Sequence, residues 1–148
     1  MKTLALFSML LCAQTAVDVK GTMPTASYQK DASVGASYTA LSSVNATVLK
    51  SGQFIFTNWV AVSGSTARWI KFYDLATNPA TTDAPFLVIK TNASLHITGQ
   101  TSLPPGGVFI KNGLAIRITA NAAENDDTAV TAGDVILKYF YRAGVNEL

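Results

Sequence analysis

The second half of the chain alternates apolar and polar side chains with a period of two. Between residues 114 and 119, Leu114, Ile116 and Ile118 fall on one side of an extended chain and Arg117 falls on the other. Residues 67–74 and 134–142 alternate in the same way. This period is typical of β-strands with one buried face, and no long window shows the helical period. The pattern therefore predicts strands and no helix.

Turn residues divide the chain into short segments of this kind. The segments with strand character are residues 37–43, 46–49, 54–62, 67–74, 85–90, 95–98, 108–110, 114–119 and 134–142. Short strands with regular turn punctuation are typical of two-layer β-folds. We therefore predict an all-β protein, an antiparallel β-sandwich or jelly roll with an extended N-terminal arm.

Two of the turns predict hairpins. The first is the turn at Gly52, between the segments 46–49 and 54–62. The second is Lys111, Asn112 and Gly113, because Asn-Gly between two alternating runs favours the positive φ of a tight hairpin turn.

The apolar side chains exceed what one small core needs. Hydrophobic residues make up 49% of the sequence and charged residues 14%. Residues 54–62 and 134–142 carry large apolar groups on both faces, whereas a monomeric sandwich requires only one apolar face per strand. The surplus predicts an oligomer, and a homotrimer is our expectation.

The N-terminal segment has two interpretations. Residues 1–16 carry one lysine followed by an apolar run from Leu4 to Ala13, which is typical of an export signal but too short to span a bilayer. The cleavage site for a signal peptidase is unfavourable. Cleavage after Ala16 would place Gln14 at a position where a small side chain is preferred. The alternative is a retained arm. We therefore divide the chain into an arm or signal with linker, residues 1–35, and a β-sandwich domain, residues 36–148.

The charge and the single cysteine exclude several classes of function. The net charge is +2, with scattered Lys and Arg rather than the basic stripe that nucleic-acid binding requires. Cys12 alone can form no intrachain disulfide and no multi-thiolate metal site. We predict no nucleic-acid partner and no membrane partner.

Candidate chemical groups are few, and each has a structural explanation. His96 is the single histidine, without an activated nucleophile in the sequence to accompany it. The acidic residues of the 124–134 segment match no calcium-loop spacing and indicate a solvated turn; they are Glu124, Asp126, Asp127 and Asp134. Asp74 and Asp83 bracket a loop and are typical of turn residues rather than of a glycosidase pair.

The remaining candidates are five aromatic residues and two glycosylation sequons. A carbohydrate-stacking platform is one hypothesis for the strand aromatics, although core or interface packing is the more common role; they are Trp59, Trp69, Tyr73, Tyr139 and Tyr141. The sequons begin at Asn45 and Asn92. We predict no catalytic, cofactor-binding or metal-binding residue, and no enzymatic activity.

Three segments of the second half resemble a known group of proteins. These are WIKFYDLATNPATTDAPFLVIKT, LPPGGVFIKNGLAIRIT and DDTAVTAGDVILKYFYR. Over residues 68–142 their order is similar to that of small structural proteins of tailed-bacteriophage virions. The resemblance implies a jelly-roll-like capsid decoration, or cement, protein, often trimeric, with the major capsid protein as partner, the capsid surface as location and no catalytic residues. The alternatives are a phage tail or fibre component, and an exported, secreted or periplasmic β-sandwich that binds glycans or surfaces.

Overall fold

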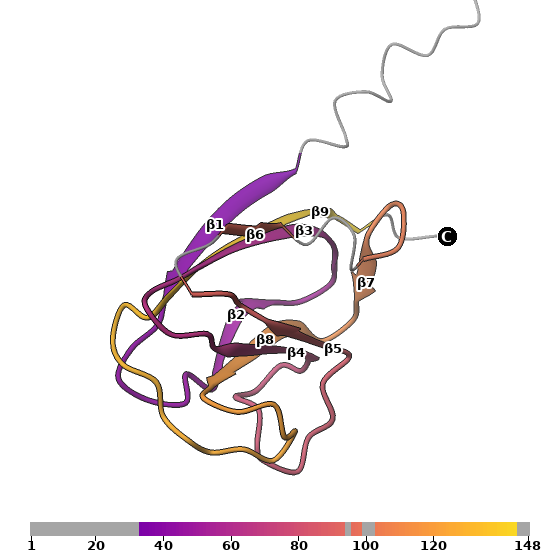
Figure 1. Ribbon diagram of the computed structural model, residues 1–148. Coiled ribbons are helices and arrows are strands. Elements are labelled where there is room, and N and C mark those ends of the chain that lie inside the picture. Colours follow the sequence, from indigo (N-terminus) through magenta and orange to yellow (C-terminus); the bar gives the residue numbers. More distant parts are fainter. Residues whose placement is uncertain (1–32, 94–95, 99–102, 145–148) are drawn as a thin grey trace, which may run out of the picture. The chain divides into compact units, whose positions relative to one another are not determined.

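The computed structural model describes residues 33–93, 96–98 and 103–144, and these residues form nine strands and no helix (Figure 1). The compact unit that contains them runs from Ala32 to Leu148. The strands are β1 (Val34–Thr39), β2 (Thr47–Ser51), β3 (Phe54–Ser63), β4 (Trp69–Asp74), β5 (Leu87–Lys90), β6 (His96–Thr98), β7 (Val108–Ile110), β8 (Gly113–Thr119) and β9 (Val135–Ala143). The predicted all-β class is confirmed. The predicted arm, residues 1–35, lies outside the described residues except for its last three.

The strands form two sheets in which all the ladders are antiparallel. The first sheet has the order β1-β9-β3-β6, and β7 pairs with β3 beyond the end of β6. The second sheet has the order β2-β8-β4-β5. This is the strand order of a jelly roll, with the position next to β3 divided between β6 and β7. The predicted sandwich is therefore confirmed at the level of strand order.

The core lies between the two sheets and is built from the inward half of each alternating strand. Phe56 of β3 packs against Phe72 of β4 with ring centroids 5.4 Å apart, and Trp59 lies 6.3 Å from the same Phe72 ring. Leu114, Ile116 and Ile118 of β8 are fully buried, as their alternation predicts. Burial of such apolar side chains is the dominant stabilising contribution in a fold of this kind.

A β-bulge in β3 changes which side chains face this core. The register with β9 shifts between Phe56 and Asn58, and the Asn58 side chain accepts a hydrogen bond from the Trp59 amide at 2.8 Å. The extra residue turns Trp59 inward and Val60 outward. The apolar character of both faces of residues 54–62 therefore has two causes, the bulge and an apolar outer surface.

Both predicted hairpins are wrong. β2 pairs with β8 and β3 pairs with β9, so the turn at Gly52 carries the chain from one sheet to the other. The turn at Asn112 and Gly113 does the same between β7 and β8, and neither residue has positive φ. The amide of Gly52 donates to the carbonyl of Asn112 at 3.1 Å, so the two corners are joined to each other.

Asp74 explains why the Asn-Gly segment adopts this other conformation. Its carboxylate accepts hydrogen bonds from the amides of Lys111, Asn112 and Gly113 at 3.0, 2.7 and 3.3 Å. A Cβ at position 113 would lie 2.8 Å from the carbonyl oxygen of Leu75, so glycine is required there for close backbone approach. The chain is bent by contacts with a distant strand rather than by the local turn preference.

Candidate functional site

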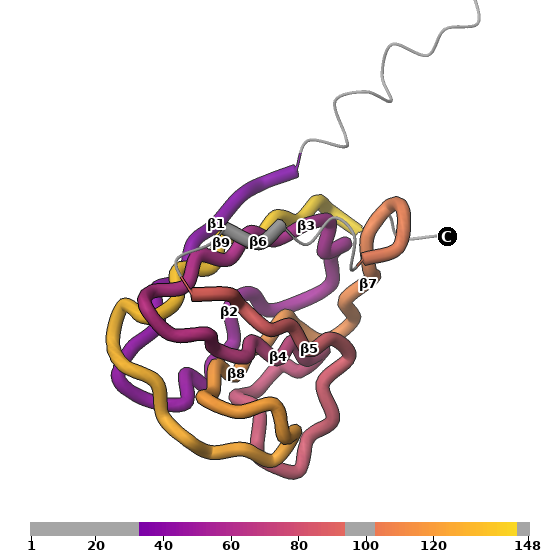
Figure 2. Tube along the Cα trace, viewed as in Figure 1, coloured from indigo at the N-terminus to yellow at the C-terminus, as the bar shows by residue number. Residues whose placement is uncertain are grey.

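The outward face of the second sheet is covered by the connection between β8 and β9. In Figure 2 this orange segment runs beyond the second sheet before the chain returns to β9 in the first. Lys71 of β4 and Arg117 of β8 lie directly opposite each other on that face and are 0% and 1% exposed. Arg117 thus points away from the core, as predicted, but it is covered by a loop whose position the strand pattern does not reveal.

The loop binds these two buried cations through backbone carbonyls and one carboxylate, and the buried Nε of Arg117 has no hydrogen-bond partner among the described residues. The Lys71 ammonium donates to the carbonyl oxygens of Ala123 and Glu124, and Arg117 donates to the carbonyl of Asp126 at 3.1 Å and to the carboxylate of Asp127 at 2.7 Å. Burial lowers the pKa of Lys71, and Arg117 adds to this effect, whereas the nearby carboxylates oppose it. The loop is therefore held against the sheet by charge-assisted hydrogen bonds.

Asp126 organises the loop internally. Burial works to raise the pKa of its carboxyl group, but hydrogen bonds from Thr128 and from the backbone and side chain of Asn121 outweigh that effect and hold the pKa at about 2. The acidic segment is thus an ordered turn around one carboxylate.

The other acidic residues of the segment have separate positions. Asp127 pairs with Arg117, and Asp134 pairs with Arg68 at 2.6 Å. Glu124 is exposed, and its carboxylate makes no hydrogen bond or ion pair to the described residues. In the part of the chain that the structure describes, no three potential metal ligands of the His, Cys, Asp or Glu type come together. The acidic segment does not converge on a calcium-like site.

The outward face of the first sheet is open in contrast. We call it the open face, and define it by the side chains of Ile55, Val60, Val62, Phe109, Ile136, Lys138 and Phe140. Phe109 is 53% exposed and Ile136 42% exposed, while the remaining apolar members are half-buried. Registers of β9 and β7 with β3 place these residues on one face. The predicted apolar outer surface of β9 and β3 is confirmed.

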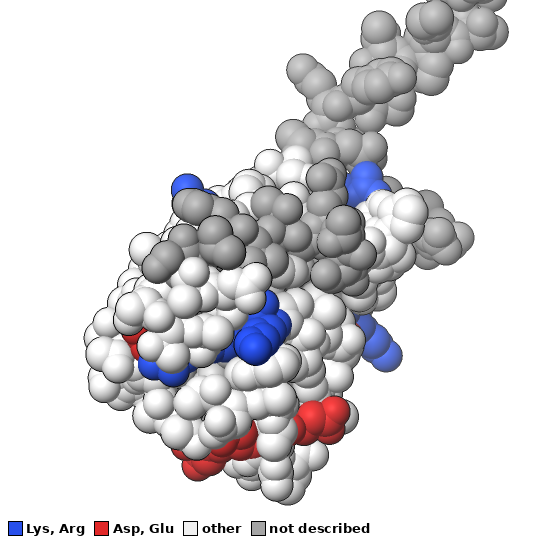
Figure 3. Space-filling model, in the orientation of Figure 1, with Lys and Arg blue, Asp and Glu red and all other residues white. Residues whose placement is uncertain are grey.

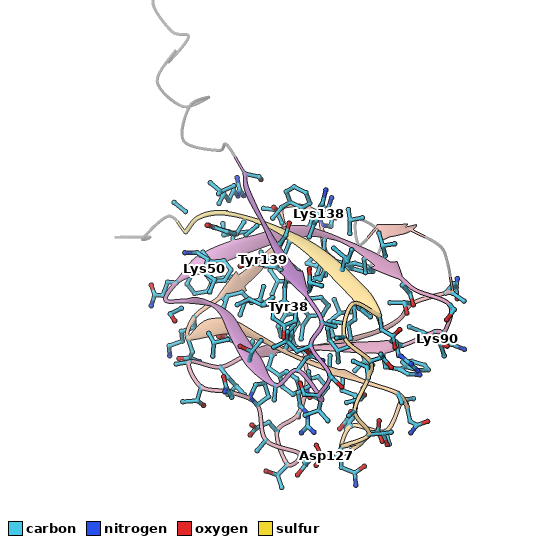
Figure 4. The ribbon with its side chains drawn as sticks, turned by 90° about the vertical axis from the view of Figure 1, so that its left-hand side faces the viewer. Tyr38, Lys50, Lys90, Asp127, Lys138 and Tyr139 are labelled. Carbon is cyan, nitrogen blue, oxygen red and sulfur yellow. The ribbon has the colours of Figure 1, made fainter. Side chains whose placement is uncertain are left out.

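Lys138 is the exposed charged residue of the open face, and Arg142 lies further along β9 on the same side of the sheet, opposite Ile55. Lys138 neighbours Ile136 and Phe140 along β9 and lies opposite Val60 of β3. Figure 4 shows it on the side of β9 that faces away from the second sheet. Its side chain is exposed and makes no hydrogen bond or ion pair within the described residues. Gly35 of β1 leaves room for the neighbouring Phe140 ring, which a Cβ there would approach to 3.0 Å.

The aromatic residues considered as a carbohydrate platform are divided among separate places. Trp59, Tyr73 and Tyr139 are buried. The half-buried Trp69 has the Lys90 ammonium 5.7 Å from its ring centroid, and the half-buried Tyr141 has that of Lys50 at 4.5 Å. The five rings therefore form no common exposed surface.

The remaining candidates of the sequence have structural positions or lie outside the description. Asp83 accepts the amide of Ala80 at 2.7 Å, as expected of a turn residue, whereas the amides bound by Asp74 are remote in sequence. Asn45 is 3% exposed and bonds Leu41 and Tyr38, so its sequon is buried. The side chain of His96 lies outside the described residues, although its backbone pairs with β3.

Comparison with protein-family models, with curated proteins and with solved structures finds no match for this chain. The described residues form no helix long and apolar enough to cross a membrane. The resemblance to phage virion proteins therefore stays a prediction. The candidate function is inferred from the difference between the outer faces of the two sheets.

Proposed function

We propose that this chain is a non-enzymatic structural protein of a virion, a capsid decoration or cement protein that binds the assembled head of a tailed phage. The observation that carries the proposal is the contrast between the two outer faces. The loop covers the middle of the second sheet, where Lys71 and Arg117 are buried, although Val88 and Lys90 of the edge strand β5 remain half-buried and exposed, respectively. The first sheet presents an apolar face at the surface. A contiguous exposed apolar patch on a β-sandwich is typical of a protein that is covered by partners.

The structural roles of the charged side chains support a binding function. The buried ionisable groups Lys71 and Arg117 are used to hold a loop, and Asp74 and Asp83 bind backbone amides. A jelly roll with such internal ties is a rigid body, and rigidity lowers the entropic cost of association. A cement protein gains from this rigidity because it bridges several subunits through many weak contacts.

The predicted arm would extend the reach of this body. The largely polar stretch from Val17 to Ser33 precedes the first strand, and a fully extended chain of that length spans roughly 55–60 Å. Attachment to the major capsid protein through both an arm and the body would multiply the two affinities.

Co-sedimentation with assembled heads tests the proposal. Full-length protein added to heads purified without it should sediment with them in a saturable amount and raise their melting temperature. A variant that begins at Ala32, where the compact unit begins, should stay folded but lose attachment. If the full-length protein does not bind heads, the decoration function is wrong, and if it is found by electron microscopy on the tail or fibres, the alternative phage role replaces it. Normal attachment of the truncated body would remove the arm from the mechanism.

A further inference from the structure

We propose that copies of this chain associate through two different surfaces, the open face around Lys138 on one copy and the loop tip around Glu124 on the next. The loop tip is residues 122–125. This inference rests on the proposed assembly function, because it specifies how copies of a decoration protein contact one another. A closed trimer requires two distinct complementary patches, since rotation by a third of a turn never brings a surface onto itself.

Lys138 opposes contact between two open faces. Pairing about a two-fold axis would bring two Lys138 ammonium groups into one apolar interface, where each loses water and repels the other. The open face is therefore complementary to a small apolar surface that carries a carboxylate, because the carboxylate can pair with the Lys138 ammonium.

The loop tip carries a carboxylate beside small apolar side chains. Glu124 is exposed, and its carboxylate makes no hydrogen bond or ion pair with the described residues. Ala122 and Ala123 beside it are exposed and small, so they can approach an apolar sheet closely. Asp127 is also exposed, at 68% of its side chain, but Arg117 already pairs with it.

The loop tip is also held in place before any contact forms. Lys71 binds the carbonyl oxygens of Ala123 and Glu124, so the backbone of the tip is fixed by a buried cation. A pre-ordered loop loses little conformational entropy when it docks. The Glu124 carboxylate acts on Lys71 through its charge, but it makes no hydrogen bond or ion pair with the described residues, so its oxygens can accept hydrogen bonds from a second copy.

The two surfaces lie on different sides of the sandwich. The open face belongs to the first sheet and the loop covers the second, and in Figure 4 Lys138 lies at the top of the molecule and Asp127 of the loop at the bottom. Most of the acidic side chains visible in Figure 3 also lie at the lower end of the view. One copy therefore cannot fill its own open face with its own loop, and the contact joins successive copies. The apolar side chains supply most of the affinity, while the Lys138–Glu124 pair selects the partner surface.

Charge exchange tests this contact on the purified full-length protein. Sedimentation equilibrium should show that Lys138→Glu and Glu124→Lys each raise the dissociation constant by about tenfold or more, because each places like charges against each other. The double variant, K138E with E124K, should restore association to near the wild-type value. Lys111→Glu is the matched control, since Lys111 is exposed and outside both surfaces, and it should leave association unchanged. Thermal melting of each variant shows whether it is folded.

The outcomes separate this inference from the proposed function. Folded single variants that associate like the wild type, or a folded double variant that is no better than the singles, would overturn the contact. A wild-type protein that is monomeric at all concentrations would overturn it too, while binding of that monomer to heads would leave the decoration function standing. Failure to bind heads, with the charge exchange behaving as expected, would overturn the decoration function alone.

Discussion

Replacement of Asp74 by alanine should destabilise the sandwich more than a typical surface substitution does. Asp74 ends β4 in the second sheet, and its carboxylate binds three successive amides at the corner where β7 of the first sheet leads into β8. The carboxylate therefore fixes the position at which the chain crosses between the sheets. Its loss removes the carboxylate acceptor of all three amides.

The magnitude follows from the number and quality of these hydrogen bonds. A hydrogen bond to a charged acceptor contributes about 1.5–3 kcal/mol when it is buried. Asp74 is only half-buried and the Gly113 contact is long, at 3.3 Å, so solvent competes for the carboxylate. We therefore expect Asp74→Ala to lower the free energy of unfolding by about 2–3 kcal/mol for the three bonds together.

Urea denaturation measures this difference directly. Asp83→Ala is the matched control, because Asp83 accepts a single amide within an exposed loop, and its loss should be about 0.5–1 kcal/mol. The slope of unfolding free energy against urea should stay the same for both variants, since each still unfolds from the same compact state. If Asp74→Ala costs no more than Asp83→Ala, the carboxylate does not hold the corner and our explanation of the Asn-Gly segment is wrong.

Three further predictions concern other parts of the fold. The pKa of Asp126 is about 2 in the folded protein against an ordinary 3.8, so its stabilising contribution is complete above that ordinary value and is lost as the pH falls toward 2. Because the group is largely exposed, we expect Asp126→Asn to remove only about 1 kcal/mol of acid sensitivity in urea titrations between pH ~5 and ~2, and an unchanged pH profile would contradict this. Gly107→Ala should cost about 3 kcal/mol or more in the same assay, because φ is 93° and a Cβ would clash with the carbonyl oxygen of Phe56. Gly106→Ala, with φ of 89° but open space around it, should cost only about 1 kcal/mol, and equal losses would refute the steric argument. Tyr73→Phe should be neutral or stabilise by up to about 1 kcal/mol, because the hydroxyl is buried and has no hydrogen-bond partner among the described residues, and a clear loss of stability would show that the hydroxyl has one.

The strands and their inward faces could be predicted because alternation is a local property. The core positions Leu114, Ile116 and Ile118 follow directly from a period of two, and so does the alternation of β9. The bulge at Asn58 could not be predicted, since nothing in the alternation marks where an extra residue enters a ladder. Without it, Asn58 rather than Trp59 would face the core.

The pairing of the strands could not be predicted from the same pattern. Alternation shows which side chains share a face, but it does not show to which sheet a strand belongs. Gly52 and the Asn112–Gly113 pair are good hairpin residues, and in an isolated segment their local preference would decide. In the fold, the three amides bound by Asp74 and the bond from Gly52 to Asn112 outweigh that preference.

The difference between the outer faces of the two sheets could not be predicted from the individual strands either, because the strands of both sheets show the same alternation. What separates them is the connection after β8, whose backbone carbonyls meet Lys71 and Arg117. A buried ammonium and a buried guanidinium on adjacent strands would repel each other and lose water if nothing covered them, so the loop and the two cations stabilise one another. The same contacts that cover the middle of the second sheet hold the tip around Glu124 in place. One arrangement therefore covers the middle of the second sheet and orders the loop tip, while the first sheet keeps an apolar outer face at the surface.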